Sequence, residues 1–256
     1  MISNPSSRQV KSVETSFEII HLLQEYGGAT LNEVAAHLEI AKSTAHNYLG
    51  TLESMGYVVK RDRTYRLGLR FLTHGMAARN SLSIADIVQQ SLVTVAQETG
   101  QSTWWIVEEF GRGFFVDNAV PDEDGDSYGT IGKRSYLHTH APGKAILAQL
   151  SRDYVWELID YHGLPIYTTK TITDADTLIQ ELDTIRDQGY AVSDGETALG
   201  VQSTGVAFED PYGGTNAIGV FGYTHDFGGE SLEKDIPSLL KHVVSDITQS
   251  LEREVE

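Results

Sequence analysis

Apolar residues recur every three or four positions over the first quarter of the chain, which is the spacing of amphipathic helices. One such run covers residues 12–26 and ends at a pair of glycines. A second helix is expected to start at Thr30, because Glu33 follows at the spacing of a capping box. After a short turn, a third helix is expected over residues 42–55, and Gly56 closes it.

Two short stretches of strand-like residues follow, at positions 57–60 and 64–67. The polar residues 61–63 between them predict a hairpin. A helix, a turn, a second helix and a hairpin in this order predict a winged helix-turn-helix over residues 11–68. The polar residues 1–10 before it are expected to form a flexible arm.

The third helix of this unit begins with polar residues that its buried stripe leaves on the outside. They are Lys42, Ser43, Thr44, His46 and Asn47. A helix start fits the major groove of DNA, and its free N–H groups favour phosphate oxygens.

The hairpin adds cations that are suited to the DNA backbone or a minor groove. They are Lys60, Arg61, Arg63 and Arg66. We expect these groups to share one outward surface with the start of the third helix. Each feature alone also fits an ordinary small domain with solvated charges, but their order and spacing favour DNA binding.

Charge is divided unevenly along the chain of 256 residues, whose formal net charge is −17. Residues 1–80 hold nine Lys and Arg against seven Asp and Glu, a net charge of +2. The remainder holds ten against 29, a net charge of −19. A polyanion would be repelled by the acidic part, so nucleic acid contact is assigned to the amino-terminal part.

Cysteine is absent, which excludes disulfides, thiolate metal sites and a cysteine nucleophile. No run approaches the roughly 18 apolar residues of a membrane span. We therefore expect a soluble, cytoplasmic protein without a membrane partner. The excess of acidic residues also suits a surface adapted to high salt.

The pattern after residue 68 predicts a second domain of the α+β class. Residues 69–100 are expected to form a linker helix and the first helix of that domain, with a break near Asn80-Ser81. A helix is expected after Thr173, where Asp176 takes the third helical position, and the last helix is expected over residues 231–252. Strands are expected at residues 103–108, 113–118, 190–193, 204–208 and 216–223.

Several motifs occur in a fixed order after the winged helix. They are Tyr65-Arg66-Leu67-Gly68, Glu98-Thr99-Gly100, Ile131-Gly132-Lys133-Arg134, Leu137-His138, Gly143-Lys144-Ala145-Ile146-Leu147-Ala148, and Gly189-Tyr190 leading to Glu196-Thr197-Ala198-Leu199-Gly200. This order resembles the IclR family of transcription regulators over residues 11–250. The resemblance implies a winged helix-turn-helix, a linker helix and, over residues 101–256, a GAF-like effector-binding domain whose antiparallel sheet is flanked by helices. It also implies a dimer or tetramer that binds double-stranded DNA at an inverted-repeat operator.

In relatives of this kind, small organic acids or aromatic acids bind on one face of the sheet. The resemblance places Ala141 and Pro142 on the loop before the Gly-Lys-Ala helix. It carries the other effector positions to Ser193, Asp194, Ser203, Gly219 and Phe221. The bulky Phe221 replaces a hydroxyl and would shrink the pocket. Alternatively, Ser203 and Asp194 satisfy only local backbone groups.

Other chemistries find little support in the sequence. His138 and His140 would point to opposite faces of an extended segment and lack a third ligand, so we expect no metal site. The acidic residues 122–126 lack the glutamate that a calcium loop needs at its last position. Lys144 has no phosphate cradle before it, and no catalytic motif or cofactor site appears. We expect a DNA-binding regulator controlled by a small-molecule effector; the alternative is a metabolite-sensing or metabolite-processing protein whose first domain contacts other proteins.

Overall fold

A computed structural model describes residues 9–121, 128–225 and 234–255. Its contacts divide the chain into two compact units that meet between Leu82 and Ser83. The expected flexible arm and the acidic residues 122–126 lie largely or wholly outside the described residues. Within the described ranges, no helix is both long enough and apolar enough to cross a bilayer.

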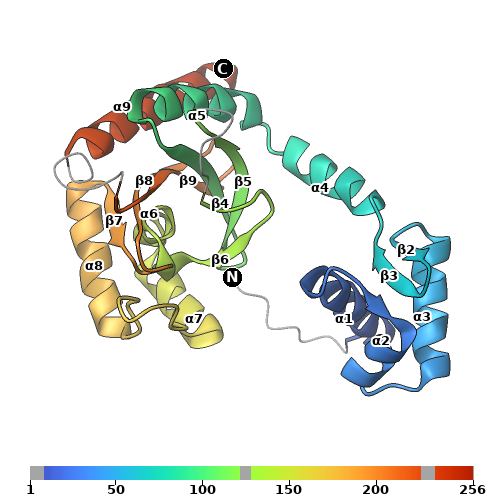
Figure 1. Cartoon of the computed structure of the whole chain (residues 1–256). Helices are drawn as coiled ribbons and strands as arrows, with labels where there is room; N and C mark the ends of the chain where they lie inside the picture. Colours follow the sequence, from blue (N-terminus) through green and yellow to red (C-terminus); the bar gives the residue numbers. More distant parts are fainter. Residues whose placement is uncertain (1–8, 122–127, 226–233, 256) are drawn as a thin grey trace. The chain divides into compact units, whose positions relative to one another are not determined.

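The amino-terminal unit has the architecture of a winged helix-turn-helix (Figure 1). Its small sheet has the strand order β1-β3-β2. The apolar stripes of the first three helices meet in one core with Val58 and Tyr65 of the hairpin. The elements are α1 (Lys11–Glu25), β1 (Ala29–Thr30), α2 (Leu31–His37), α3 (Lys42–Ser54), β2 (Val58–Arg61), β3 (Thr64–Leu67) and α4 (Arg70–Asn80).

The capping box at the start of α2 is confirmed. The Thr30 backbone N–H donates to Glu33 Oε2 at 2.7 Å, and the Glu33 N–H donates to Thr30 Oγ1 at 3.3 Å. These two bonds satisfy backbone N–H donors at the start of α2, the first helix of the helix-turn-helix pair. Helix α4 differs from the other helices of this unit, because none of its residues is buried.

The carboxy-terminal unit is an antiparallel sheet of strand order β6-β5-β4-β9-β8-β7 with helices on both faces (Figure 1). Helix α6 lies on one face with α8 packed beside it, and α5 and α9 pack side by side on the other face. The elements are α5 (Ala85–Thr99), β4 (Ser102–Glu109), β5 (Arg112–Ala119), β6 (Arg134–Tyr136), the 3-10 turn η1 (Leu137–Thr139), α6 (Ala141–Gln149), α7 (Arg152–His162), α8 (Ala175–Gln188), β7 (Ala191–Asp194), β8 (Val201–Glu209), β9 (Thr215–Tyr223) and α9 (Ile236–Val255).

Two local predictions for this unit were wrong. The helix after Thr173 is capped by Asp174, whose side chain accepts from the Thr177 N–H, so Asp176 is not the third helical residue. His138 does not lie in an extended segment, because Leu137–Thr139 form a 3-10 turn directly before α6, and only His140, the N-cap of α6, has extended backbone angles. Strand β6 and helix α7 were not predicted at all.

Glycines allow helix α6 to lie directly on the sheet. Gly205 of β8 and Gly219 of β9 are register partners, and both face Pro142 in the first turn of α6. A Cβ on Gly219 would lie 2.0 Å from Pro142 Cγ, and one on Gly205 would lie 2.5 Å from the Pro142 backbone. A third glycine, Gly143, passes so close to Leu137 that its Cβ would lie 2.2 Å from the Leu137 carbonyl oxygen.

We predict that Gly219→Ala destabilises the carboxy-terminal unit by about 1–3 kcal/mol, because the methyl group overpacks this contact. Thermal unfolding followed by tryptophan fluorescence measures the effect, since Trp104, Trp105 and Trp156 all lie in this unit. Gly75→Ala in α4 is the control: its added methyl group meets nothing within 4 Å. It should leave the transition unchanged. A Gly219→Ala protein that melts like the wild type would contradict the prediction.

Candidate nucleic-acid interface and effector site

The start of helix α3 is open to solvent, as expected. Lys42, Ser43, Thr44, His46 and Asn47 are all exposed, while Ala45, Leu49 and Leu52 face the core. Ala41 precedes the helix, and no side chain caps its first turn. The N–H groups of that turn are therefore left for an outside acceptor such as a phosphate oxygen.

The cations of the hairpin are also exposed. However, they do not all lie on one face of the hairpin, which differs from the prediction. Register partners lie on the same face of a sheet, and Arg66 pairs with Val59 while Arg61 pairs with Thr64. These four residues form the outer face. Lys60 pairs instead with the buried Tyr65 and holds its ammonium 5.0 Å from the centre of that ring.

The turn of the hairpin adds a third outward cation. Asp62 adopts a positive φ of 57°, which lets the chain reverse within two residues. Arg63 occupies the other position of this turn and is exposed. The outward surface of the wing therefore consists of Arg61, Arg63 and Arg66, and Lys60 lies at its edge because strand alternation turns it to the other side.

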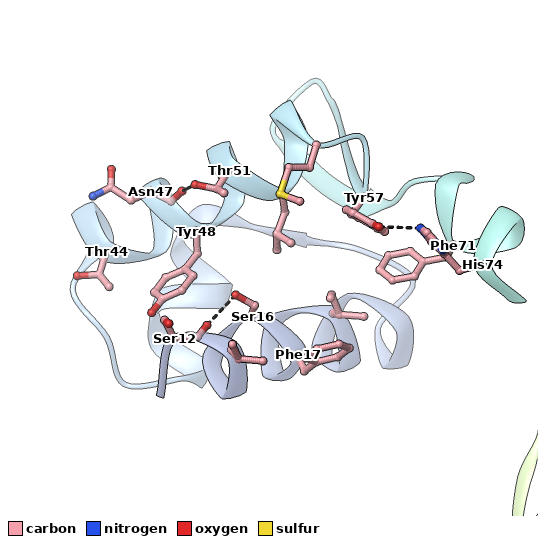
Figure 2. A pocket seen from close by; sticks show the side chains of 14 residues that line it. Ser12, Ser16, Phe17, Thr44, Asn47, Tyr48, Thr51, Tyr57, Phe71 and His74 are labelled. Atoms are coloured by element: carbon pink, nitrogen blue, oxygen red, sulfur yellow. Dashed lines mark hydrogen bonds between the residues drawn. The ribbon is translucent and has the colours of Figure 1, made fainter. Parts of the chain in front are cut away.

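A groove of about 840 Å³ opens beside α3 in the same unit (Figure 2). Its apolar floor and walls come from α1, α3 and α4 together with Tyr57. Thr44 and Asn47 of the predicted DNA-contacting set lie at one end of it. The lining residues are Ser12, Val13, Ser16, Phe17, Ile20, Thr44, Asn47, Tyr48, Thr51, Leu52, Met55, Tyr57, Phe71 and His74.

Four of the predicted effector residues form a closed packing contact. Ala141 and Pro142 belong to the first turn of α6 rather than to a loop before it, which corrects the prediction. Pro142 covers Gly219, and Ser203 Oγ accepts from the Ala141 N–H at 3.1 Å. These contacts support the alternative that Ser203 satisfies a backbone group at the helix start.

The neighbouring pair on strand β7 divides between core and surface. Ser193 is buried, whereas Asp194 lies at the surface in an ion pair with Lys170, 2.6 Å from Asp194 Oδ2 to Lys170 Nζ. That hydrogen bond from Lys170 holds the pKa of the Asp194 carboxyl below its usual value. Asp194 also accepts from Gln202 Nε2 at 3.1 Å, so local partners occupy it.

Phe221 belongs to a group of buried rings that we call the ring cluster: Trp104, Phe115, His140 and Phe221. The centre of the Phe115 ring lies 5.1 Å from that of Trp104, 5.6 Å from that of His140 and 5.8 Å from that of Phe221. These residues come from β4, β5, the start of α6 and β9. Their side chains meet on the face of the sheet that α6 covers.

Burial keeps His140 neutral within this cluster. Its Nδ1 accepts from the Gly143 N–H at 3.0 Å and its Nε2 lies 2.8 Å from Ser135 Oγ. Loss of hydration lowers the pKa of His140 to about 3, and the nearby Lys133 ammonium acts in the same direction. Burial also lowers the pKa of His138, to about 4.

Tyr128 and Lys133 lie against the ring cluster. The Tyr128 ring stacks on Phe221, with centres 5.3 Å apart and planes 17° apart. Its hydroxyl lies 2.8 Å from Thr197 Oγ1 and accepts from Lys133 Nζ at 2.8 Å. The same ammonium lies 5.2 Å from the centre of the Phe115 ring. A cation and several rings thus meet at one place on the face of the sheet that α6 covers.

Lys144 is fully buried and serves an internal role. Its Nζ donates to Glu196 Oε1 at 2.7 Å and to Glu181 Oε1 at 3.1 Å. Burial raises the pKa of the Glu196 carboxyl, and the Lys144 ammonium partly counteracts this. The ion pair ties α6 to the segment after β7 and explains why lysine occurs near this helix start without a phosphate site.

Sequence reasoning found Phe221 but missed its partners. Trp104 and Phe115 lie in predicted strands, where alternation gives the face of a side chain but not its neighbours on other strands. Tyr128 lies in a loop without periodicity, so no pattern marks it. Lys133 belongs to the motif Ile131-Gly132-Lys133-Arg134, and that motif was the one sequence signal near the ring cluster.

The fold and these two sites define a two-domain transcription regulator that joins a winged helix to a ligand-binding domain. Family models match both parts: the IclR helix-turn-helix domain over residues 12–62, and the bacterial transcriptional regulator IclR C-terminal domain over residues 76–249. The chain belongs to the IclR family of DNA-binding transcription regulators, whose carboxy-terminal domain binds an effector.

Individual relatives agree with this assignment. The chain is 32% identical over 207 residues to a probable HTH-type transcriptional regulator ArcR from Halobacterium salinarum, covering 79% of each chain. An IclR transcriptional regulator from Alicyclobacillus acidocaldarius has a TM-score of 0.79 at 26% identity, covering 94% of this chain and 99% of the other. For the Thermotoga maritima IclR the TM-score is 0.74 at 26% identity, covering 95% and 99%. The relatives are regulators rather than enzymes, so the metabolite-processing alternative is wrong.

We predict that His140 makes the stability of the carboxy-terminal unit depend on pH. Its pKa is lowered in the folded state, so the unfolded chain takes up the proton first as the pH falls below about 6.5, and stability is lost toward pH 3 at about 1.4 kcal/mol per unit. His140→Asn keeps an acceptor for the Gly143 N–H but cannot titrate. Between pH 7.5 and 5.5, urea unfolding should show the wild type losing about 1.4 kcal/mol more than this variant.

His242→Asn serves as the control for this comparison, because it makes the same substitution at an exposed histidine of the same unit and leaves the buried His140 in place. Parallel profiles for the wild type and His140→Asn would show that the buried imidazole does not carry the effect.

Proposed function

We propose that the protein acts as a homodimer that reads an inverted-repeat operator and responds to a small-molecule effector. The observation that carries this proposal is the uncapped, exposed start of helix α3, and the exposed arginines of the wing in the same unit support it. A major groove accepts such a helix, and the wing lies where the flanking backbone would pass. The acidic remainder of the chain restricts DNA contact to this surface.

The two parts of the surface have different roles in this proposal. Ser43, Thr44, His46 and Asn47 carry donors and acceptors that suit base edges, and they supply sequence recognition. Lys42 and the wing arginines contact phosphate oxygens and set the register on the duplex. Lys60 has a smaller part, since its ammonium already lies beside the Tyr65 ring.

A second copy of the chain is the proposed occupant of the groove in the same unit. Helix α4 has no buried residue, and Leu72 and Met76 of the helix and Leu69 just before it are exposed beside a groove that is itself apolar. A projecting apolar helix and an apolar recess on one unit are the two halves of a self-complementary interface. An inverted repeat requires this two-fold arrangement, which would place one α3 on each half-site.

We predict that the double variant Arg61→Ala/Arg63→Ala binds operator DNA at least about tenfold more weakly and with a shallower salt dependence, because two phosphate contacts are lost. Gel shifts of the full chain on promoter fragments at several salt concentrations measure both effects. The matched control is Arg134→Ala/Arg253→Ala, two exposed arginines of the other unit. Equal binding by wild type and wing variant would refute the role of the wing.

We predict that Phe17→Asp, which places a charge in the groove, separates the two half-sites. Binding to a complete inverted repeat should weaken by at least about tenfold, while binding to a single half-site stays within about twofold. Phe110→Asp alters a similarly exposed phenylalanine of the other unit and is the control. If Phe17→Asp bound the complete repeat as tightly as the control, the groove would not hold a second copy.

A further inference from the structure

We propose that a set of contacts between helix α4 and the end of helix α3 determines which distance between operator half-sites the regulator accepts. We call these contacts the α3–α4 junction; they are made by Met55, Tyr57, Arg70, Phe71 and His74. This inference rests on the proposed function, because it requires a dimer that places one α3 on each half-site. It makes Tyr57 and Arg70 positioning residues for the specificity of the operator spacing.

Arg70, the first residue of α4, contacts the carboxy-terminal end of α3. Its Nη1 donates to the carbonyl oxygen of Met55, which is the C-cap of α3. The last turn of α3 has no basic residue of its own, so this guanidinium supplies the cation that the free carbonyl groups at a helix end favour. The start of one helix is thereby bonded to the end of the other.

The side chain of Tyr57 contacts the first two turns of α4. Its hydroxyl lies 2.7 Å from His74 Nε2 (Figure 2). Its ring is stacked on the His74 ring, with centres 5.6 Å apart and planes 17° apart, and its centre lies 5.0 Å from that of the Phe71 ring. Arg70 Cζ lies 5.1 Å from the centre of the same tyrosine ring. One aromatic side chain thus contacts three residues of α4.

The backbone of Tyr57 is fixed to the rest of the unit by two further hydrogen bonds. Its N–H donates to the Leu52 carbonyl oxygen of α3 at 2.9 Å, and its carbonyl oxygen accepts from the Gly68 N–H at 2.7 Å. Gly68 approaches so closely that a Cβ there would lie 2.4 Å from the Gly56 carbonyl oxygen. The chain that enters α4 is therefore packed against the chain that leaves α3.

The junction is what orients α4 within the amino-terminal unit. None of the residues Arg70–Asn80 is buried, so the core of the unit does not fix the direction of this helix. The junction also lies at the proposed interface, because Tyr57, Phe71 and His74 line the groove that a second copy would occupy. In the proposed dimer, the direction of α4 relative to α3 consequently sets the separation of the two α3 helices.

The length of α4 converts a small change of direction into a change of spacing. Its 11 residues extend over about 16 Å. A rotation of about 10° at the junction would move the far end of the helix by about 3 Å, which is close to the roughly 3.4 Å between successive base pairs. A dimer that prefers one spacing therefore needs a firmly held α4, and the two polar links of the junction provide it.

Gel shifts with operators of altered spacing test this inference. Selection from a random DNA library with the full chain supplies the operator, which is then lengthened or shortened by one base pair between its half-sites. The wild type should bind the altered operators at least about tenfold more weakly, a ratio that we call the spacing penalty. Tyr57→Phe/Arg70→Ala loses both polar links but keeps a ring in the groove wall, and its penalty should fall to at most about threefold. Each single variant should lie between these values.

The control is Arg79→Ala, which removes the same charge near the far end of α4, where the guanidinium donates to the neighbouring Asn80. It should keep the spacing penalty of the wild type. A single half-site should bind the wild type and every variant within about twofold, which shows that the reading helix is folded in each.

The possible results separate this inference from the proposed function. A change that weakens the dimer directly reduces binding at every spacing and leaves the ratio unaltered. An unchanged spacing penalty in Tyr57→Phe/Arg70→Ala would therefore overturn the role of the junction, and so would a wild type that selects an inverted repeat but accepts every spacing. A wild type that selects no inverted repeat would overturn the proposed function, and this inference with it.

Discussion

The close contact between helix α6 and strands β8 and β9 is the constraint on which the effector domain depends. The helix reaches the sheet only because Gly205 and Gly219, paired across the two strands, place no side chain between the strands and Pro142. Any larger residue at these positions would hold the helix away from the sheet. At this separation His140 can cap the helix while its ring joins the buried cluster, and Lys144 can reach Glu196. The residues around Gly143-Lys144 therefore serve mainly to pack α6 against the sheet. This packing places the ring cluster beside the start of the helix.

Burial determines what the charged and titratable groups of the two domains do. In the effector domain, His140 stays neutral and the ammonium of Lys144 is neutralised by two carboxylates, so neither offers charge to a ligand. Lys133 Nζ lies beside the rings and donates to the Tyr128 hydroxyl. In the DNA-binding domain the wing arginines remain exposed, which leaves their charge for phosphate groups. Similar residue types thus serve packing or DNA contact according to their depth.

Periodicity and turn signals were sufficient for most elements of the fold. The helix-turn-helix, its capping box and the wing follow from local spacing, because each depends on residues that are close in sequence. The buried ring cluster was less accessible to prediction, since its residues come from four separate segments. Position-by-position transfer gave Gly219 and Ser203, which prove to be packed under α6, while Tyr128 and Lys133 were not selected. Strand alternation fixes the face of Lys60 as well, and attention to register would have separated it from the wing arginines.

The Tyr128 ring completes the packing of the buried ring cluster. The ring cluster is nearly free of solvent contact, and a void among buried rings costs dispersion contacts and destabilises the fold. A partly exposed tyrosine from the neighbouring loop fills the space and keeps Lys133 hydrogen-bonded.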